Sequence, residues 1–473
     1  MCMVSDFRQS VLLLGTVVVF ACWISVTFVS RQPGHMAVAY FLLAAAAMVL
    51  STAFVVWHYY KFNKPIPFLW LLATAILLRL VSIFGVPLFE DDYYRYMWDG
   101  YQTIVTNDPY TLAPAVFFDR EDYPEIFDSI LSLINYPEIA TVYGPVTQWV
   151  FALGYLIQPA SIWPLQLTAG VADIAVIVLL YKLGAGRALL FYAWSPLILK
   201  EFSLTAHPDI YAILAMVLSI YLVKRNQCWL AGIALALGVG AKIFAVLALP
   251  YLLSQRWSLR YWSTILGWFF VTLALITLAF GTVTVWTPEG LQAMADSWLF
   301  NSAVYLLLLE VLPFQSIKLL LLGVFAAYIL FTGLYRLHTA RNSALQSKIR
   351  ASTDTATDTA TDMATVAWQD SRYAFRGDWL FMLFLMALPV VNAWYVAWLL
   401  PFATLFPRWW SWGMSYFCLL SYLTGANLGY LDQTALELPT SIVVIEYLAV
   451  TGVFLFAWVF SRTHPRYRLY ARV

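Results

Sequence analysis

The stretch Phe89-Glu90-Asp91-Asp92-Tyr93-Tyr94-Arg95-Tyr96-Met97-Trp98-Asp99-Gly100 lies where an apolar segment ends and a long acidic loop begins. Three consecutive carboxylates stand at this boundary. Carboxylates are costly to hold in hydrocarbon, so such a cluster beside a membrane is a candidate functional site. The apolar segments on both sides of the loop decide the fold class.

The composition is that of a polytopic membrane protein. Of the 473 residues, 62% are hydrophobic and only 11% are charged, with a mean hydropathy of +0.75. Soluble domains carry about 25% charged residues. Because a span needs about 20 apolar residues, we predict an all-α protein of about 12–14 transmembrane helices. Its first external loop is long.

Charge and cysteine content exclude other classes of protein. The net charge is +1 and no basic stripe is present, which argues against a nucleic-acid partner. The four cysteines are scattered, so they indicate neither a disulfide framework nor a metal site.

The chain divides at a repeat of four residues, Thr353 to Asp362, which has no large apolar side chains. Such a segment cannot bury a core and reads as a disordered tether. We expect an N-terminal catalytic module over 1–335, a cytoplasmic low-complexity loop over 336–376 and a C-terminal transmembrane module over 377–473.

The distribution of Lys and Arg predicts the orientation. One threading places the loops rich in Lys and Arg and both termini in the cytoplasm, and the loop 87–142 outside. That loop has eleven acids against two bases, Arg95 and Arg120. The acids are Glu90, Asp91, Asp92, Asp99, Asp108, Asp119, Glu121, Asp122, Glu125, Asp128 and Glu138.

Adjacent carboxylates repel, so at least one of Glu90, Asp91 and Asp92 should have a raised pKa or share a cation. This suits a general base, or a site for a divalent cation such as Mg²⁺ or Mn²⁺ with Asp91 and Asp92 as ligands. The alternative is an acidic helix end that faces water. Arg95, three and four residues on, would place a cation beside the pair if a helix restarts here.

This string, followed by Asn107-Asp108-Pro109-Tyr110, resembles a motif of bacterial multi-pass glycosyltransferases with the C-type (GT-C) fold, which use polyprenyl-phosphate sugars and include mannosyltransferase-like members. Met97 departs from the family's usual Leu, and Asp108 separates an Asn and a Pro that are normally adjacent. Further matches follow in the expected order: Tyr143-Gly144-Pro145, His207-Pro208-Asp209, Lys242, Trp298-Leu299-Phe300-Asn301, and Asn392-Ala393-Trp394-Tyr395 with Trp398.

The resemblance implies a GT-C-like fold whose long first external loop carries short amphipathic helices. It also implies transfer of a hexose, with mannose favoured, from a polyprenyl-phosphate donor to an acceptor hydroxyl on the external face, with inversion. Asp91 matches the family's first acid and is our choice for the base, with Asp92 as its metal-binding or orienting partner and Glu90 as the third acid. The candidates for binding the donor phosphate or sugar are Arg95, Trp98, Asp99, His207, Asp209, Lys242, Asn301, Asn392, Trp394 and Tyr395.

Several residues have structural alternatives. Asp209 follows Pro208 and is equally compatible with a helix cap. Packing is the favoured role for Trp394. Asp173, inside an apolar run, is expected to be a buried hydrogen-bonding residue, whereas Lys200 and Glu201 are expected at interfaces.

The expected location is a bacterial inner (plasma) membrane, with a lipid, glycan or protein as acceptor. The alternative function is a polytopic transporter or a flippase for lipid-linked sugars. Transporters often show inverted repeats and charges near the bilayer midplane. We find no repeated transmembrane unit, and the acids concentrate in one external loop.

Overall fold

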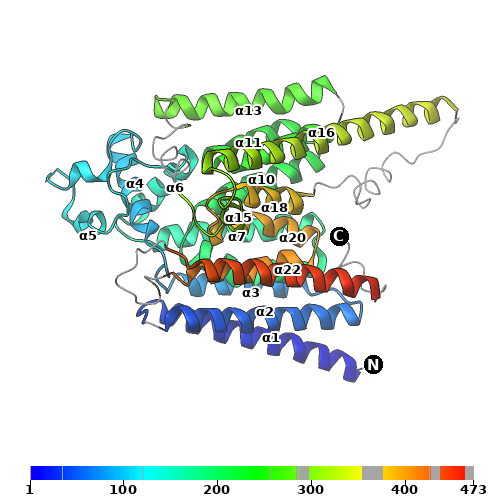
Figure 1. The fold of residues 1–473 in the computed structure, drawn as a ribbon, viewed down its shortest axis with the longest axis horizontal. Coiled ribbons are helices and arrows are strands. Elements are labelled where there is room, and N and C mark those ends of the chain that lie inside the picture. Colours follow the sequence, from blue (N-terminus) through cyan, green and yellow to red (C-terminus); the bar gives the residue numbers. More distant parts are fainter. Residues whose placement is uncertain are drawn as a thin grey trace.

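Helices lying side by side form a bundle, with a separate lobe at one end (Figure 1). This computed structural model describes residues 2–34, 36–120, 122–256, 258–283, 286, 298–353, 376–424, 427 and 437–463. No strand occurs among these residues. The prediction of an all-α polytopic membrane protein is therefore confirmed.

Among the described residues, six helices are long and apolar enough to cross a membrane, and a bent pair of helices brings the number to seven if it counts as one span. Six shorter apolar helices of 10–17 residues accompany them. The predicted 12–14 crossings are reached only if these shorter helices cross as well. The six long segments are Gln9–Val29, Ala37–Lys61, Trp163–Lys182, Leu259–Phe280, Phe314–Tyr335 and Thr440–Val459.

The first half of the chain builds most of the bundle and all of the described lobe. Its elements are α1 (Cys2–Val29), α2 (Ala37–Lys61), α3 (Phe68–Ser82), α4 (Asp92–Thr106), η1 (Pro114–Phe117), η2 (Glu125–Phe127), α5 (Asp128–Leu131), α6 (Pro145–Ile157), α7 (Trp163–Lys182), η3 (Gly186–Ala188), α8 (Leu189–Ala193), α9 (Pro196–Ile198), η4 (Leu199–Leu204), α10 (Asp209–Lys224), α11 (Cys228–Ala241), η5 (Ile243–Ala248), α12 (Leu249–Ser254) and α13 (Leu259–Phe280).

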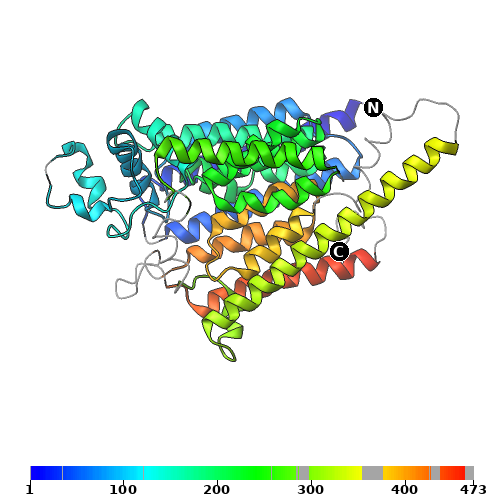
Figure 2. The ribbon, with the colours of Figure 1, turned by 90° about the horizontal axis from the view of Figure 1, so that it is seen from above.

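The second half returns to the same bundle. Its elements are α15 (Ala303–Leu308), α16 (Phe314–Thr353), α18 (Gly377–Ala387), α19 (Ala393–Val396), η7 (Ala397–Leu399), α20 (Leu400–Leu405), α21 (Trp409–Phe417), η8 (Cys418–Tyr422) and α22 (Thr440–Thr463). One hydrophobic cluster extends from Val11 to Val450, so the two predicted transmembrane modules share a core. Figure 2 shows α16 running obliquely to its neighbours.

The predicted loop 336–376 is wrong over its first part, because α16 continues to Thr353. Ten of the 18 residues from 336 to 353 are Ala, Arg, Leu, Gln or Lys, which all favour helix. The rest of the tandem repeat, from residue 354 on, lies outside the described residues.

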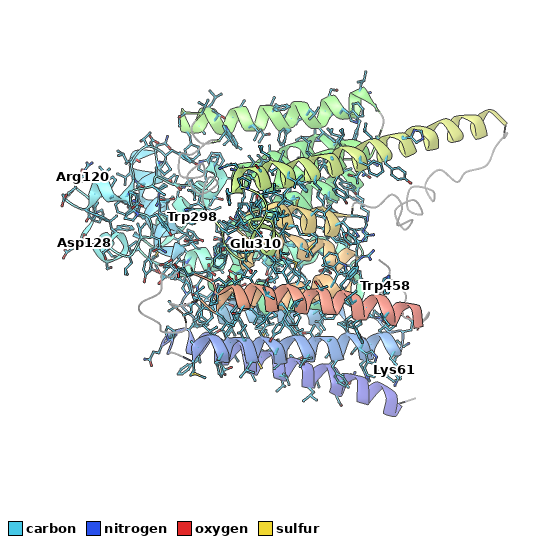
Figure 3. The ribbon with its side chains drawn as sticks, in the orientation of Figure 1. Lys61, Arg120, Asp128, Trp298, Glu310 and Trp458 are labelled. Carbon is cyan, nitrogen blue, oxygen red and sulfur yellow. The ribbon has the colours of Figure 1, made fainter. Side chains whose placement is uncertain are left out.

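The lobe contains the predicted external loop and has its own small core. Met97, Trp98, Phe117, Phe127 and Ile130 are buried together there. The loop carries short helices, as predicted. Arg120 and Asp128 lie in this lobe, whereas Lys61 lies at the opposite end of the bundle, where α1 begins and α22 ends (Figures 1 and 3). This arrangement agrees with the predicted threading, and the side of the membrane remains a prediction.

Buried polar contacts tie the bundle together beneath the lobe. Arg79 of α3 forms an ion pair with Asp173 of α7 at 2.7 Å, and Tyr192 Oη donates to the same carboxylate at 2.8 Å. Asp173 is thus the buried hydrogen-bonding residue that the sequence predicted. The pair anchors α3, the helix that leads into the acidic segment.

Candidate active site

Glu90 lies at the junction of bundle and lobe, between the end of α3 and the start of α4. The preceding residue, Phe89, has φ = +66°, a conformation that is rare for a bulky side chain. Its ring packs against Phe41 and Tyr422. Strained backbone of this kind persists only where the surroundings enforce it, and it often accompanies functional sites. Here the turn directs Glu90 inward, with 8% of its side chain exposed.

Two charged residues of the η4 segment meet Glu90. Lys200 and Glu201 are both fully buried, which corrects their predicted placement at interfaces. Lys200 Nζ donates to Glu90 and lies 3.3 Å from Glu201 Oε2. The η4 turn is a π-helix, a form common at functional sites. An adjacent anion and cation can share one buried location because each neutralises the other.

Tyr422 of η8 completes this cluster from the far end of the sequence. Its hydroxyl lies 2.8 Å from Glu90 Oε1 and 2.7 Å from Lys200 Nζ, and it also contacts Glu201. Tyr422 therefore joins the C-terminal helices to the start of the external loop.

His207 lies in the break between η4 and α10, which bends the chain by 113°. Ala206 before it has φ = +59°. One ring nitrogen, Nε2, hydrogen-bonds Glu90, and Nδ1 lies 3.0 Å from Tyr96 Oη. Trp394 stacks on the imidazole at 4.1 Å between ring centroids. The imidazole is thus held on both nitrogens and on one face.

The three consecutive acids have different environments. Burial raises the pKa of Glu90, but the positive charges of Lys200 and His207 more than offset it and hold the pKa at about 2. Burial raises the pKa of Asp91, although Asn135 donates a hydrogen bond to it. Burial also raises the pKa of Asp92, to about 6, with Glu90 and Asp91 adding repulsion.

Within the described part of the chain, the Asp92 carboxylate has no hydrogen-bonding or ion-pair partner. It lies within electrostatic reach of His207 and Lys242. Of the three acids, Asp92 is thus the one free to accept a proton from a bound molecule. A carboxyl group with a pKa near 6 is well suited to general base catalysis near neutral pH.

Lys242 supplies a second cation close to Asp92. Its ammonium contacts both oxygens of Asp209 at 2.8 Å and lies 4.5 Å from the centroid of the Tyr395 ring. About 24% of the Lys242 side chain is exposed, so an anion can reach it. Asp209 is the first residue of α10, and its carboxylate binds Lys242 and the indole of Trp398.

Other predicted site residues lie in the interior of the lobe. The helix does restart at Asp92, but Arg95 pairs with Asp99 at 2.7 Å and donates to the Ile139 carbonyl, instead of lying beside the acid pair as expected. Asp99 is fully buried with Thr141 and Gln148. Trp98 has no exposed surface.

The two predicted asparagines lie on adjacent segments. Phe300 and Val390 form an isolated parallel bridge, which aligns the segment before Asn301 with the segment before Asn392. The Asn301 amide donates to Glu446 of α22 at 3.2 Å. Asn392 is half-buried and precedes α19. Their part in binding a donor stays a prediction.

Sequence reasoning did not assign Lys200, Glu201 or Tyr422 to the site. A signal was available for the first two, because charged residues inside an apolar run are functional candidates by default. Tyr422 gave no signal, since it lies 222 residues from Lys200 and only the fold brings the two together.

One group of described side chains has ligand atoms close enough to hold a metal ion. Its members are Glu90, Glu201 and His207, whose ligand atoms all lie within 4.8 Å of one another. Asp91 and Asp92, the predicted ligands, do not belong to this group. Lys200 already contacts both carboxylates of the group. In the native protein these residues therefore do not fit a divalent cation.

Comparison with protein families decides the class of protein. Residues 7–257 match the model of the MptA_B family, described as the N-terminal domain of alpha-(1->6)-mannopyranosyltransferase. The chain belongs to this family. The match covers more than half of the chain and supports a mannosyltransferase of the GT-C type. No curated protein and no solved structure gives a significant match.

The matched residues include most of the site. Glu90, Asp92, Lys200, His207 and Lys242 all lie within residues 7–257. The protein is thus a glycosyltransferase that transfers mannose. Its apolar helices indicate that it is embedded in a lipid bilayer.

Proposed function

We propose that this mannosyltransferase transfers mannose from a polyprenyl-phosphate donor to an acceptor hydroxyl on the external face of a bacterial plasma membrane, with inversion. One observation carries the proposal: the carboxylate of Asp92, which has no hydrogen-bonding or ion-pair partner among the described residues, lies near His207 and Lys242 at the junction of bundle and lobe. A base and a phosphate-binding cation are the two groups that this reaction needs.

Asp92 acts as the base in this mechanism. It takes the proton of the acceptor hydroxyl while the oxygen attacks the anomeric carbon, and the bond from that carbon to the phosphate oxygen breaks on the opposite face. The sequence favoured Asp91 for this role, and the choice between them is open to experiment. The hydrogen-bond pattern supports Asp92, since Asp91 accepts from Asn135.

The leaving group is a phosphate and needs positive charge more than a proton. Glycosidases differ because an alcohol leaving group requires a second carboxyl as acid. Lys242 is the best placed cation, because its ammonium is partly exposed while Asp209 holds it in position. His207 is more deeply buried, and its link to Glu90 lets it orient the site.

The family description suggests the acceptor and the form of the donor. An α-(1→6) linkage implies attack by the 6-hydroxyl of an acceptor mannose. If the reaction inverts the anomeric centre, an α product requires a β-linked mannosyl phosphate. The acceptor then carries the preceding mannose on a lipid or glycan.

The remaining predicted residues have supporting roles in this proposal. Arg95 and Asp99 hold the lobe by their ion pair, with Trp98 in its core. Trp394 and Tyr395 lie against His207 and Lys242, respectively, and line the site. Asn301 and Asn392 come from the neighbouring paired segments.

The test is transfer by the purified protein in lipid nanodiscs. Radiolabelled polyprenyl-phosphate mannose and GDP-mannose are offered separately with an α-mannoside acceptor, and NMR determines the linkage of the product. We expect label in an α-(1→6) product from the lipid donor alone. Use of GDP-mannose would contradict the proposed donor, and a β-linked product would contradict inversion of a β-linked donor. Movement of the lipid donor across a membrane without transfer would instead support the flippase alternative.

A further inference from the structure

A buried ammonium lies among the side chains that come closest to forming a metal site. Lys200 Nζ donates to Glu90 and lies 3.3 Å from Glu201 Oε2. Because the Lys200 side chain is fully buried, water does not compete for these contacts. His207 Nε2 approaches the same two carboxylates, with 3.8 Å to Glu201 Oε2. The ammonium therefore contacts two of the three candidate ligands directly.

Charge favours the ammonium over a divalent ion at this position. The two carboxylates, Glu90 and Glu201, supply two negative charges when ionised, and the ammonium of Lys200 that contacts both already supplies one positive charge. A divalent ion added to the same cluster would leave an excess of positive charge in a buried location, and unpaired buried charge is strongly unfavourable. The hydroxyl of Tyr422 adds hydrogen bonds to this native set.

Geometry nevertheless suits a metal once the ammonium is gone. A hard divalent ion with bonds of about 2.1 Å separates neighbouring ligand atoms by about 3 Å and opposite ones by about 4.2 Å. The ligand atoms of Glu90, Glu201 and His207 lie within 4.8 Å of one another. Carboxylate oxygens with imidazole nitrogen are a ligand set that Mn²⁺ accepts.

We infer that Lys200 is a resident cation that takes the place of a divalent metal, holding Glu90 and His207 in position, and that its removal turns Glu90, Glu201 and His207 into a divalent-cation site. Lys200 is then a positioning residue, since it acts through Glu90 and His207. The binding part of this inference does not depend on the donor or acceptor proposed above.

Three variants of the full-length protein in nanodiscs test the binding. Lys200→Ala removes the charge and leaves space, Lys200→Met removes the charge but fills the space, and Lys200→Ala with Glu201→Gln also removes a ligand. Mn²⁺ is the probe, followed by loss of the EPR signal of the free ion and by thermal unfolding. We expect Lys200→Ala to bind one more Mn²⁺ than the wild type and to gain in Tm with Mn²⁺. The other two variants should show neither effect.

Failure of Lys200→Ala to bind the additional Mn²⁺ would overturn the inference, as would equal binding by Lys200→Met. If Lys200→Ala does not fold, a comparison of the wild type with Glu201→Gln still tests whether Lys200 excludes a metal. Mn²⁺ binding should be the same for the wild type and for Glu201→Gln. Lower binding by Glu201→Gln would show that the native cluster already takes a metal, which contradicts a resident ammonium.

A second measurement follows mannose transfer and rests on the proposed function. The wild type should keep its rate in the presence of a chelator. Lys200→Ala should lose at least about tenfold, because it leaves buried carboxylates unpaired, and Mn²⁺ should restore part of the rate in this variant but not in Lys200→Met. Loss of wild-type transfer on chelation would overturn the inference. If no sample transfers mannose, that result contradicts only the proposed donor. The binding of Mn²⁺ then tests the role of Lys200 by itself.

Discussion

Asp92 differs from its acidic neighbours because no side chain in the described part of the structure forms a hydrogen bond or ion pair with its carboxylate. Glu90 is held by Lys200 and His207, and Asp91 by Asn135. The three acids that are adjacent in sequence thus have three different environments in the structure. The physical cause is that each carboxylate meets a different set of neighbouring side chains.

The pH dependence of the rate follows from the raised pKa of Asp92. Burial raises that pKa to about 6, so the carboxyl group is protonated and inactive as a base at lower pH. We expect kcat/KM to fall about tenfold per pH unit below pH about 6 and to be level above it. Steady-state assays from pH 4.5 to 8 measure this profile. The control is Asp119→Asn, which changes an exposed acid of the lobe and should show the same pH profile as the wild type. A flat profile down to pH 4.5 would argue against a base with this pKa.

The contact between α4 and α6 positions the acidic segment at the scale of elements. A Cβ on Gly100 of α4 would lie 2.8 Å from the carbonyl carbon of Phe151 on α6 and still closer to its oxygen. Backbone cannot move aside as a flexible side chain can. The glycine therefore permits the close approach that joins lobe and bundle.

Gly100→Ala should destabilise the protein by about 1–3 kcal/mol, because the two helices must separate. Gly267→Ala on α13 is the matched control, since a Cβ there meets nothing within 4 Å. It should be neutral or stabilising by up to about 1 kcal/mol, as expected when Gly becomes Ala inside a helix. Thermal unfolding of both variants in one detergent provides the comparison. Equal Tm values for the two variants would refute the role given to this contact.

Local patterns predicted the elements well and the site only in part. Long apolar runs identified the six long helices, and the acids from Glu90 to Asp92 were visible as a break in apolarity. The residues that contact those acids could not be predicted from the neighbouring sequence. Lys200 and Tyr422 meet Glu90 across 110 and 332 residues of sequence, and no local pattern encodes such distances. The continuation of α16 to Thr353 was missed because the predicted helix was ended where the apolar run ends, near residue 335.

At the scale of the whole molecule, the lobe lies at one end of the bundle and Lys61 lies at the other (Figure 3). An external site requires the lobe to face away from the cytoplasm. In a protein with its native cysteines replaced, Asp128→Cys on the lobe should react with a membrane-impermeant maleimide in intact cells. Lys61→Cys at the other end should react only after permeabilisation. The opposite labelling would place the site in the cytoplasm and exclude the proposed donor side.

The central claim is that the carboxylate of Asp92 removes the acceptor proton, and transfer by three matched variants tests it most directly. Asp92→Asn, Asp91→Asn and Asp119→Asn are compared with the wild type in nanodiscs with labelled polyprenyl-phosphate mannose, after equal folding is shown by thermal unfolding. We predict that Asp92→Asn lowers kcat by about 10²–10⁴-fold. Asp91→Asn should retain most of the rate and Asp119→Asn all of it. Transfer by Asp92→Asn at the wild-type rate would contradict the claim, and a loss confined to Asp91→Asn would give the role of base to Asp91.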